Sequence, residues 1–421
     1  MQVFKFGGAS VKDANGVKNV ATVLQKVGYK NTLIVVSAMG KTTNALEVVI
    51  NNYFNNKKEL QSSIQDVKKY HNAILLDLFD SDRYRNEHHP SFKKVTALFD
   101  ELSSFLEVNK SPDYNFVYDQ VIGYGELVST VIISDYFNDI GIKNNWIDAR
   151  EQIKTDNYYR RGNVNWEETQ TLITKHFNKS ILNITQGFIG SDANNFTTTL
   201  GREGSDYTAA IYAYCLNAES VTIWKDVPGV LNADPRYFEN AQLLNKISYR
   251  EAIELAFYGA SVIHPKTLQP LQQKEIPLYV KSFLNPEEPG TMVGKEIVLE
   301  PNIPCFIVKK DQVLISLSSL DFSYIVEENI SEIFNLLHTY KMKVDVIQNS
   351  AISFSVCVDN IYNNLEKLLL HLKAKFKVTY HEHVSLYTIR HYNENAIKQL
   401  EKGKTILLKQ LTEGTVQMVT K

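Results

Sequence analysis

Four features are scarce or missing in this chain of 421 residues, and each absence excludes some classes of protein. Its only cysteines, Cys215, Cys305 and Cys357, stand far apart in apolar runs, which indicates buried thiols in a reducing compartment rather than a disulfide framework. No run of about 18 apolar residues occurs, so we expect no membrane span. The formal net charge is only −2, which gives no reason to expect nucleic-acid or membrane binding. Met1 leads directly into a strand-like run without an apolar leader, so we expect a cytoplasmic protein.

The order of apolar segments predicts two domains of different class. Short buried strands such as Gln2–Phe6 and Thr32–Val36 alternate with helical stretches, which favours an α/β fold with a mainly parallel sheet between helices. A Pro/Gly-rich break at Asn285–Gly290 marks a boundary. Beyond it, strands and helices follow in β-α-β-β-α-β order with a shorter related set, as in α+β ferredoxin-like modules. We therefore expect domains over 1–290 and 300–421.

The most informative segment is Thr197–Asp206, TTTLGREGSD, which lies between an apolar strand and a helical stretch. Its glycines let the backbone approach an oxyanion, and the free N–H groups of the first helical turn point toward such a group. Arg202 adds a planar fork suited to a carboxylate or phosphate. Taken alone, the segment is equally well explained as a strand-to-helix turn rich in capping residues.

Four further segments carry polar residues where the pattern predicts a turn or a tight approach. In Lys5–Ser10, a lysine at a strand end lies beside two glycines that suit a phosphate or a simple tight turn. Ser37–Asn44 suits a helix cap or a small polar substrate. Gly123–Glu126 puts two glycines in a helical stretch, which indicates close backbone approach, and Glu126 can receive an ammonium group. Asp226–Arg236 can frame a nucleotide or form a long turn.

Together and in this order, these segments resemble the aspartate kinases (aspartokinases) of the amino-acid kinase superfamily over nearly the whole chain. The matching motifs are KFGGAS at Lys5–Ser10, SAMGKTTN at Ser37–Asn44, TQGFIG at Thr185–Gly190, TTTLGREGSD at Thr197–Asp206 and DVPGVLNADPR at Asp226–Arg236. The tail resembles the paired regulatory ACT modules of that family. The length leaves no room for the homoserine dehydrogenase fused to bifunctional relatives, so we expect a monofunctional enzyme.

The resemblance implies transfer of a phosphoryl group from ATP to the side-chain carboxylate of L-aspartate, giving 4-phospho-L-aspartate for lysine, threonine and methionine biosynthesis. The acceptor is already ionised, so the reaction needs positioning and positive charge more than acid–base help. By resemblance, Lys5 and Asp206 are catalytic, and Mg²⁺ bridges the phosphates without a separate protein metal site. The implied aspartate-binding residues are Thr43, Glu126, Phe188, Thr199, Arg202 and Ser205. The implied ATP-binding residues are Lys5, Gly7, Gly8, Ser10, Ser37, Lys225, Asp226, Leu231, Asp234, Arg236 and Ser261.

One departure from the family pattern concerns charge. Ser261 stands where many relatives carry a lysine thought to assist the phosphates. Loss of a cation at that place weakens stabilisation of the transferring group. We expect Lys225 or Lys266 to supply the missing charge.

The ACT-like tail implies feedback regulation by an end-product amino acid, with lysine or threonine as the candidate effector. The positions that match the family's effector sites are Asn329, Ile330, Val344, Asp345 and Asn349. Pairing of such modules implies a homodimer or a larger homo-oligomer. Two alternatives are a related amino-acid kinase with another substrate and a non-catalytic amino-acid sensor.

Overall fold

The computed structural model describes residues 1–79, 89–260, 263–321 and 323–421. They form two compact units, between which the chain passes more than once. The first unit contains Met1–Val230, Leu243–Ile253 and Ile263–Val298, and the second contains Leu231–Gln242, Glu254–Val262 and Leu299–Lys421.

The first unit is built on an eight-stranded sheet. In spatial order its strands are β3 (Asn144–Ile147), β4 (Leu182–Gln186), β2 (Thr32–Val36), β1 (Gln2–Phe6), β7 (Ser220–Lys225), β9 (Leu278–Ser282), β10 (Thr291–Gly294) and β8 (Lys246–Ser248). The first six run parallel and β10 is antiparallel to β9. This confirms the predicted mainly parallel sheet. Because both faces are covered, the central strands are continuously apolar rather than alternating.

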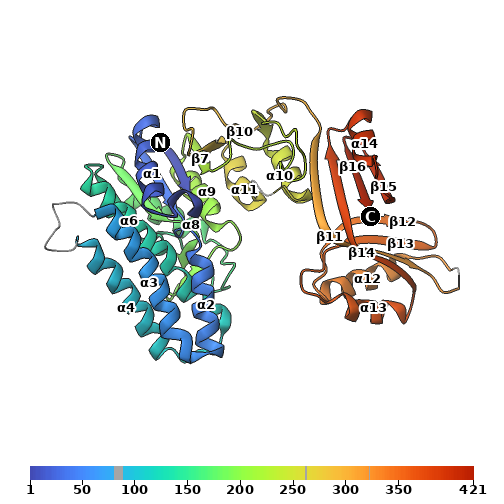
Figure 1. Cartoon of the computed structure of the whole chain (residues 1–421), viewed down its shortest axis with the longest axis horizontal. Helices are drawn as coiled ribbons and strands as arrows, with labels where there is room; N and C mark the ends of the chain where they lie inside the picture. Colours follow the sequence, from blue (N-terminus) through green and yellow to red (C-terminus); the bar gives the residue numbers. More distant parts are fainter. Residues whose placement is uncertain (80–88, 261–262, 322) are drawn as a thin grey trace. The chain divides into compact units, whose positions relative to one another are not determined.

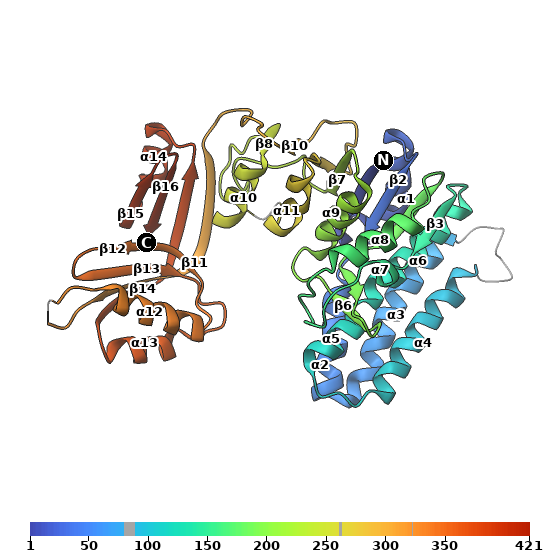
Figure 2. The ribbon, with the colours of Figure 1, turned by 180° about the vertical axis from the view of Figure 1, so that it is seen from behind.

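Helices lie on both faces of this sheet (Figures 1 and 2). Phe4 and Phe6 of β1 share a core with the helices of one face: α1 (Ala14–Val27), α2 (Thr42–Asn55), α3 (Lys57–Phe79), α4 (Ser91–Val108), α5 (Tyr114–Ile122) and α6 (Tyr124–Asp139). Successive side chains of a strand point to opposite faces, so Lys5 points toward the other helices. Those are α8 (Trp166–His176), α9 (Gly204–Leu216) and α11 (Pro265–Gln273).

Smaller elements complete the first unit. They are the 3₁₀ helix η1 (Gly8–Val11), the helix α7 (Ala149–Gln152), and a hairpin of β5 (Ile189–Ser191) with β6 (Thr197–Thr199). The predicted anion-binding segment therefore contains a short strand before the turn that leads into α9. The helix α10 (Tyr249–Tyr258) begins in the first unit and ends in the second.

The second unit contains one six-stranded antiparallel sheet. In spatial order its strands are β12 (Val344–Asn349), β13 (Ser353–Val358), β11 (Cys305–Ser318), β14 (Lys377–Arg390), β16 (Thr415–Thr420) and β15 (Ile406–Thr412), and its helices are α12 (Glu327–Thr339), α13 (Leu365–Lys373) and α14 (Glu394–Glu401). Separate apolar cores lie under α12 and α13 and under α14.

The unit consists of two modules, the first with the helices α12 and α13 and the second with α14. The strands of the two modules are interleaved in the sheet. Cys305–Lys309, the first part of β11, pairs with Leu386–Arg390 and contributes to the core under α14. The later part of β11 pairs with β13 and belongs to the core under α12 and α13. The second module therefore takes one strand from before the first, a refinement of the predicted consecutive sets, because a long strand with a bulge can serve two modules.

All three cysteines are buried, and none forms a disulfide within the described residues, as predicted. Within the described ranges, none of the helices is both long enough and apolar enough to cross a membrane.

Candidate active site

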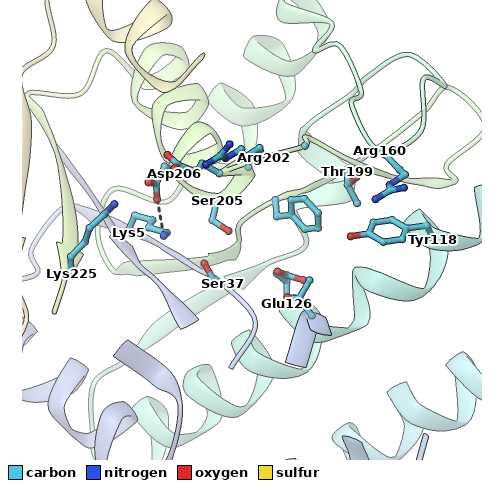
Figure 3. A pocket seen from close by; sticks show the side chains of 15 residues that line it. Lys5, Ser37, Tyr118, Glu126, Arg160, Thr199, Arg202, Ser205, Asp206 and Lys225 are labelled. Atoms are coloured by element: carbon cyan, nitrogen blue, oxygen red, sulfur yellow. Dashed lines mark ion pairs between the residues drawn. The ribbon is translucent and has the colours of Figure 1, made fainter. Parts of the chain in front are cut away.

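The predicted polar turns meet at one edge of the large sheet. The turns after β1, β2, β4 and β7 all leave the carboxyl ends of parallel strands, where ligands bind in open α/β sheets. They border a cavity of about 480 Å³ (Figure 3). Its lining residues are Lys5, Ser37, Thr43, Tyr118, Glu126, Arg160, Phe188, Thr199, Gly201, Arg202, Glu203, Gly204, Ser205, Asp206 and Lys225.

A buried ion pair lies at one end of this cavity. Lys5 Nζ is 2.7 Å from Asp206 Oδ1, and the two side chains are only 12% and 4% exposed. Asp206 stands in the first turn of α9, where the partial positive charge of a helix N-terminus stabilises a carboxylate. Lys225, at the end of the neighbouring strand β7, lies beside the pair (Figure 3). This end of the cavity combines two ammonium groups with one carboxylate, which suits the oxygens of a phosphoryl group.

Glu126 supplies a buried carboxylate to the same cavity. Its side chain is 3% exposed, and Oε1 accepts a 3.3 Å hydrogen bond from the Ala38 N–H. Oε2 has no hydrogen-bond partner within the described part of the chain. Burial raises the pKa of the Glu126 carboxyl to about 8, and the Ala38 hydrogen bond opposes part of that rise. A buried carboxylate with one unused oxygen is a receptor for a cationic group.

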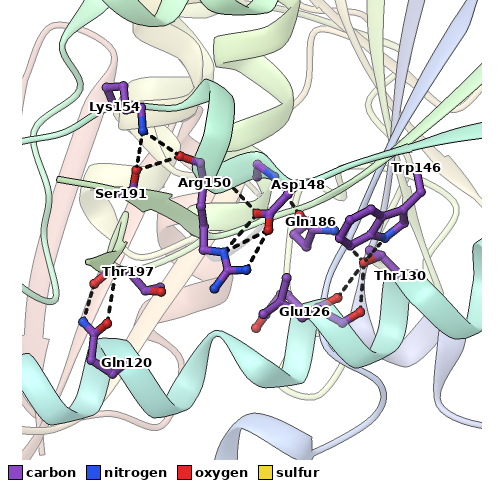
Figure 4. Close-up of polar contacts among 12 residues, drawn as sticks. Gln120, Glu126, Thr130, Trp146, Asp148, Arg150, Lys154, Gln186, Ser191 and Thr197 are labelled. Carbon is purple, nitrogen blue, oxygen red and sulfur yellow. Dashed lines mark hydrogen bonds and ion pairs between the residues drawn. The ribbon is translucent and has the colours of Figure 1, made fainter. Parts of the chain in front are cut away.

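Glu126 is held in place by a glycine and by a hydrogen-bond network. A Cβ at Gly125 would lie 3.0 Å from Ala38 Cβ, so glycine allows α6 to approach the turn after β2, as predicted from the sequence. One turn along α6, Thr130 Oγ1 donates to the Glu126 carbonyl at 2.9 Å. The same oxygen accepts from Gln186 Nε2 at 2.7 Å and from Trp146 Nε1 at 3.0 Å (Figure 4). The network therefore ties the backbone of Glu126 to β3 and β4.

The turn after β4 approaches the start of α9 very closely. A Cβ at Gly187 would lie 2.4 Å from Ser205 Cβ, so only glycine fits. The next residue, Phe188, has a left-handed φ of 72°, and its N–H donates to Thr208 Oγ1 at 2.9 Å. Both Phe188 and Ser205 line the cavity.

The opposite end of the cavity contains residues that the motifs did not reveal. The Arg160 guanidinium lies 4.2 Å from the centre of the Tyr118 ring. Asp119 is fully buried and accepts hydrogen bonds from the Arg160 and Thr199 N–H groups and from the Thr199 hydroxyl at 2.8–2.9 Å. Burial raises the pKa of Asp119 to about 6, against the effect of these hydrogen bonds. Tyr118 and Arg160 stand outside every motif, so no sequence signal marks them.

The cavity unites most of the residues that the resemblance assigns to substrates. Those in its lining are Lys5, Ser37, Thr43, Glu126, Phe188, Thr199, Arg202, Ser205, Asp206 and Lys225. The others assigned to ATP lie elsewhere. Gly7, Gly8 and Ser10 follow β1, and Asp226 follows β7, outside the cavity lining.

Four further residues were assigned to ATP, and none of them is a described residue of the first unit. Leu231, Asp234 and Arg236 belong to the second unit, where Asp234 accepts hydrogen bonds on both carboxylate oxygens, from Arg236 Nε and from Arg236 Nη2. That contact lowers the pKa of Asp234. Ser261 lies outside the described residues.

Of the two lysines considered as replacements for the missing cation, Lys225 lines the cavity and Lys266 does not. Lys266 Nζ donates to the Leu200 carbonyl at 3.1 Å and lies 4.6 Å from the centre of the Tyr207 ring. Burial lowers the pKa of Lys266.

The residues assigned to an effector lie in the first module of the second unit. Asn329 and Ile330 are in the first turn of α12, where Asn329 Oδ1 accepts from the Val326 N–H at 3.1 Å. Val344, Asp345 and Asn349 lie on β12. Asp345 is 6% exposed and pairs with Lys309 at 2.7 Å and Lys343 at 3.7 Å. The Asp345 carboxylate is therefore already paired with the ammonium groups of Lys309 and Lys343.

The cavity suits magnesium only together with phosphate ligands. Among the residues described here, no group of three or more His, Cys, Asp and Glu side chains could hold a metal ion. Mg²⁺ in kinases keeps few protein ligands and relies on substrate phosphates and water. Asp206 offers a carboxylate for that arrangement at the end of the cavity that also contains Lys5.

Comparisons with known proteins agree with this geometry. Residues 1–282 match the amino acid kinase family. The chain is 30% identical to lysine-sensitive aspartokinase 3 of Escherichia coli over 398 residues, which cover 92% of this chain and 86% of that protein. It is also 30% identical to a bifunctional aspartokinase/homoserine dehydrogenase of Arabidopsis thaliana, of which it spans 39%.

Two solved structures of E. coli aspartokinase III align over 100% of this chain. The complex with lysine and aspartate has a TM-score of 0.82 at 27% identity and is covered over 95% of its length. The complex with aspartate and ADP has a TM-score of 0.79 at 26% identity and is covered over 96%.

Proposed function

Because the chain belongs to the amino acid kinase family, and within it to the aspartokinases, we infer that its cavity transfers the γ-phosphoryl group of ATP to the side-chain carboxylate of L-aspartate. An oxygen of that carboxylate attacks the γ-phosphorus, and the bond from phosphorus to the β,γ-bridging oxygen breaks. The products are 4-phospho-L-aspartate and ADP. The observation that carries the proposal is one cavity with the Lys5–Asp206 pair at one end and the unused Glu126 oxygen in its wall.

Each charged group of the cavity has a separate role in this proposal. Lys5 and Lys225 neutralise the phosphoryl oxygens, where charge spreads during transfer. Asp206 fixes the position of the Lys5 ammonium group, and bound Mg²⁺ would further neutralise the phosphates. Glu126 receives the ammonium group of aspartate, and Arg202 receives its α-carboxylate. The substrate then approaches the phosphoryl group with its side-chain carboxylate foremost.

The nucleotide lies along the turns after β1, β2 and β7 in this proposal. Its contacts are Gly7, Gly8, Ser10, Ser37 and Asp226. Leu231, Asp234 and Arg236 belong to the second unit and Ser261 lies outside the described residues, so their assignment to ATP stays a prediction from the resemblance alone.

We propose 1–290 as the kinase domain and 300–421 as the regulatory domain of a cytoplasmic homodimer or larger homo-oligomer. The E. coli relative is named lysine-sensitive, which favours lysine over threonine as the effector. A pair of ACT-like modules provides the binding surface, with Asp345 as the ammonium receptor.

The first experiment combines purified protein with Mg-ATP, L-aspartate and hydroxylamine. Aspartate-dependent formation of aspartyl hydroxamate is the expected result. Folded protein that binds ATP but forms no hydroxamate would contradict the assignment. Product with glutamate but not with aspartate would identify a different amino-acid kinase, and amino-acid binding without any product would identify a sensor.

A further inference from the structure

The cavity contains a second arginine for which the motifs provide no role. Arg160 lines the cavity at the end away from Lys5, near Thr199 and Tyr118 (Figure 3). Arg202 lies nearer to Asp206 and Ser205 in the same view. One guanidinium group is enough to bind one carboxylate through two hydrogen bonds. The guanidinium groups of Arg160 and Arg202 must therefore bind different groups, or different edges of the same group.

The position of Arg160 is fixed by contacts on its backbone and its side chain. Its φ of 68° is left-handed, a conformation that a residue with a side chain adopts only where the surroundings hold it. The hydrogen bond from its N–H to buried Asp119, at 2.9 Å, provides that hold.

A chain of contacts also fixes the guanidinium group. It lies over the Tyr118 ring at 4.2 Å, and the Tyr118 hydroxyl donates to Glu47 Oε1 at 3.1 Å. The ring is therefore oriented at its far end by a carboxylate. A cation over the face of an aromatic ring is attracted by the ring, so the oriented Tyr118 ring holds the guanidinium in position.

The charge of Arg160 is not neutralised by an ion pair. Both oxygens of Asp119 accept hydrogen bonds from backbone N–H groups or from the Thr199 hydroxyl. Among the described residues, the ion pairs include no carboxylate partner for the Arg160 guanidinium. The charge of Asp119 acts on Arg160 without a direct ion pair among the described residues, so the guanidinium can still pair with an anionic ligand in the cavity.

We propose that Arg160 binds the α-carboxylate of the acceptor amino acid and makes the enzyme specific for acceptors that carry that group. The inference rests on the proposed function. With the side-chain carboxylate directed to Lys5 and the ammonium group at Glu126, the α-carboxylate is the remaining anion. In this proposal Arg160 binds the α-carboxylate from the side opposite to Lys5, and Arg202 binds another edge of the same α-carboxylate. Tyr118 is a positioning residue, since it acts through Arg160.

The test compares two acceptors that differ only in this group: L-aspartate and its α-amide, which keeps the side-chain carboxylate and still yields a hydroxamate. Arg160→Gly suits the left-handed backbone and removes the guanidinium. We expect the KM for aspartate to rise roughly 10- to 100-fold, the range of a lost hydrogen bond to a charged group, with little change in kcat. The KM for the α-amide stays as in the wild type.

Arg161→Gly is the matched control, because Arg161 contacts Tyr158 and does not line the cavity. It should leave both KM values unchanged. Tyr118→Leu, which removes the ring and retains Arg160, should raise the KM for aspartate by a smaller factor, and it provides a second test if Arg160→Gly folds poorly.

Three outcomes would overturn the inference. An unchanged KM for aspartate in Arg160→Gly, or an equal rise for both acceptors, would refute the role of Arg160 and leave the kinase assignment intact. A rise in the Arg161→Gly control would show a general effect of charge. Wild-type protein without aspartate-dependent product would overturn the proposed function itself, and this inference with it.

Discussion

At the scale of single residues, the buried carboxyl of Glu126 makes substrate binding depend on pH. Its pKa is raised to about 8, so in the free protein it is mostly protonated at neutral pH. An ammonium ligand requires the ionised form, and binding therefore releases a proton. We expect the KM for aspartate to fall by about tenfold per pH unit as the pH rises toward 8, and then to level off. Initial rates between pH 6 and 8.5 measure this.

The same shift predicts the pH dependence of stability. A group whose folded pKa lies above its unfolded value, here about 8 against 4.5, stabilises the folded state fully below the unfolded value and loses that contribution as the pH rises through the folded value. The unfolding temperature of the free protein should thus fall between pH 5 and 8. Glu126→Gln, which stays neutral, should lack both dependences. A KM that varies equally in the two proteins would rule out this role.

Also at the residue scale, substitution of Lys225 tests whether this lysine supplies the positive charge that is missing at Ser261. It lies beside Lys5 in the cavity, whereas Lys266 contacts the Leu200 carbonyl and the Tyr207 ring. We expect Lys225→Ala to lower kcat about 100-fold, a typical loss for one charge-stabilising group. Lys266→Ala is the matched control and should change kcat little. Turnover that survives Lys225→Ala unchanged would assign the compensating charge elsewhere.

At the scale of elements, Thr130 links α6 to two strands of the sheet (Figure 4). Thr130→Val removes the oxygen that accepts from Gln186 and Trp146, and leaves the fully buried Gln186 amide without that acceptor. We expect the free energy of unfolding to fall by about 1–3 kcal/mol, and the KM for aspartate to rise because Glu126 lies one turn away.

Thr130→Ser keeps the hydroxyl group and is the control for this prediction. Urea denaturation measures stability and the hydroxamate assay measures KM. Equal stability of the valine and serine variants would mean that the hydrogen bonds contribute nothing measurable.

Local patterns predicted the elements of the first unit well, since strands such as β1 and β2 are short apolar runs between turn residues. The close backbone approach at Gly125 was also predicted, whereas the break between α5 and α6 was not, because both glycines were placed inside one helical stretch. The long strands β11 and β14 did not follow from their local sequence. Their length depends on pairing with strands of two modules, which is a contact between segments far apart along the chain.

At the scale of the whole molecule, regulation depends on the ion pair of Asp345 in the second unit. An effector ammonium must compete there with Lys309 and Lys343. We expect lysine to inhibit, and Asp345→Asn to raise the half-inhibitory lysine concentration about tenfold or more. Titrations with lysine and with threonine, each expressed relative to the rate without effector, measure this.

Asp311→Asn is the control for regulation, because Asp311 is 84% exposed on β11 and pairs only with His383 among the described residues. It should leave the titration unchanged. Equal sensitivity of the wild type and Asp345→Asn to lysine would place the effector site elsewhere.

The sequence by itself determined the family, the parallel sheet and the edge at which the site lies. It could do so because a lysine or a glycine-rich turn directly after an apolar strand is a local signal, and parallel strands bring their carboxyl ends together. The tertiary structure alone placed Arg160 and Tyr118 in the cavity, left one oxygen of Glu126 without a hydrogen-bond partner among the described residues, and interleaved the two modules of the second unit. Each of these depends on contacts between distant segments and on exclusion of water, which no local pattern encodes.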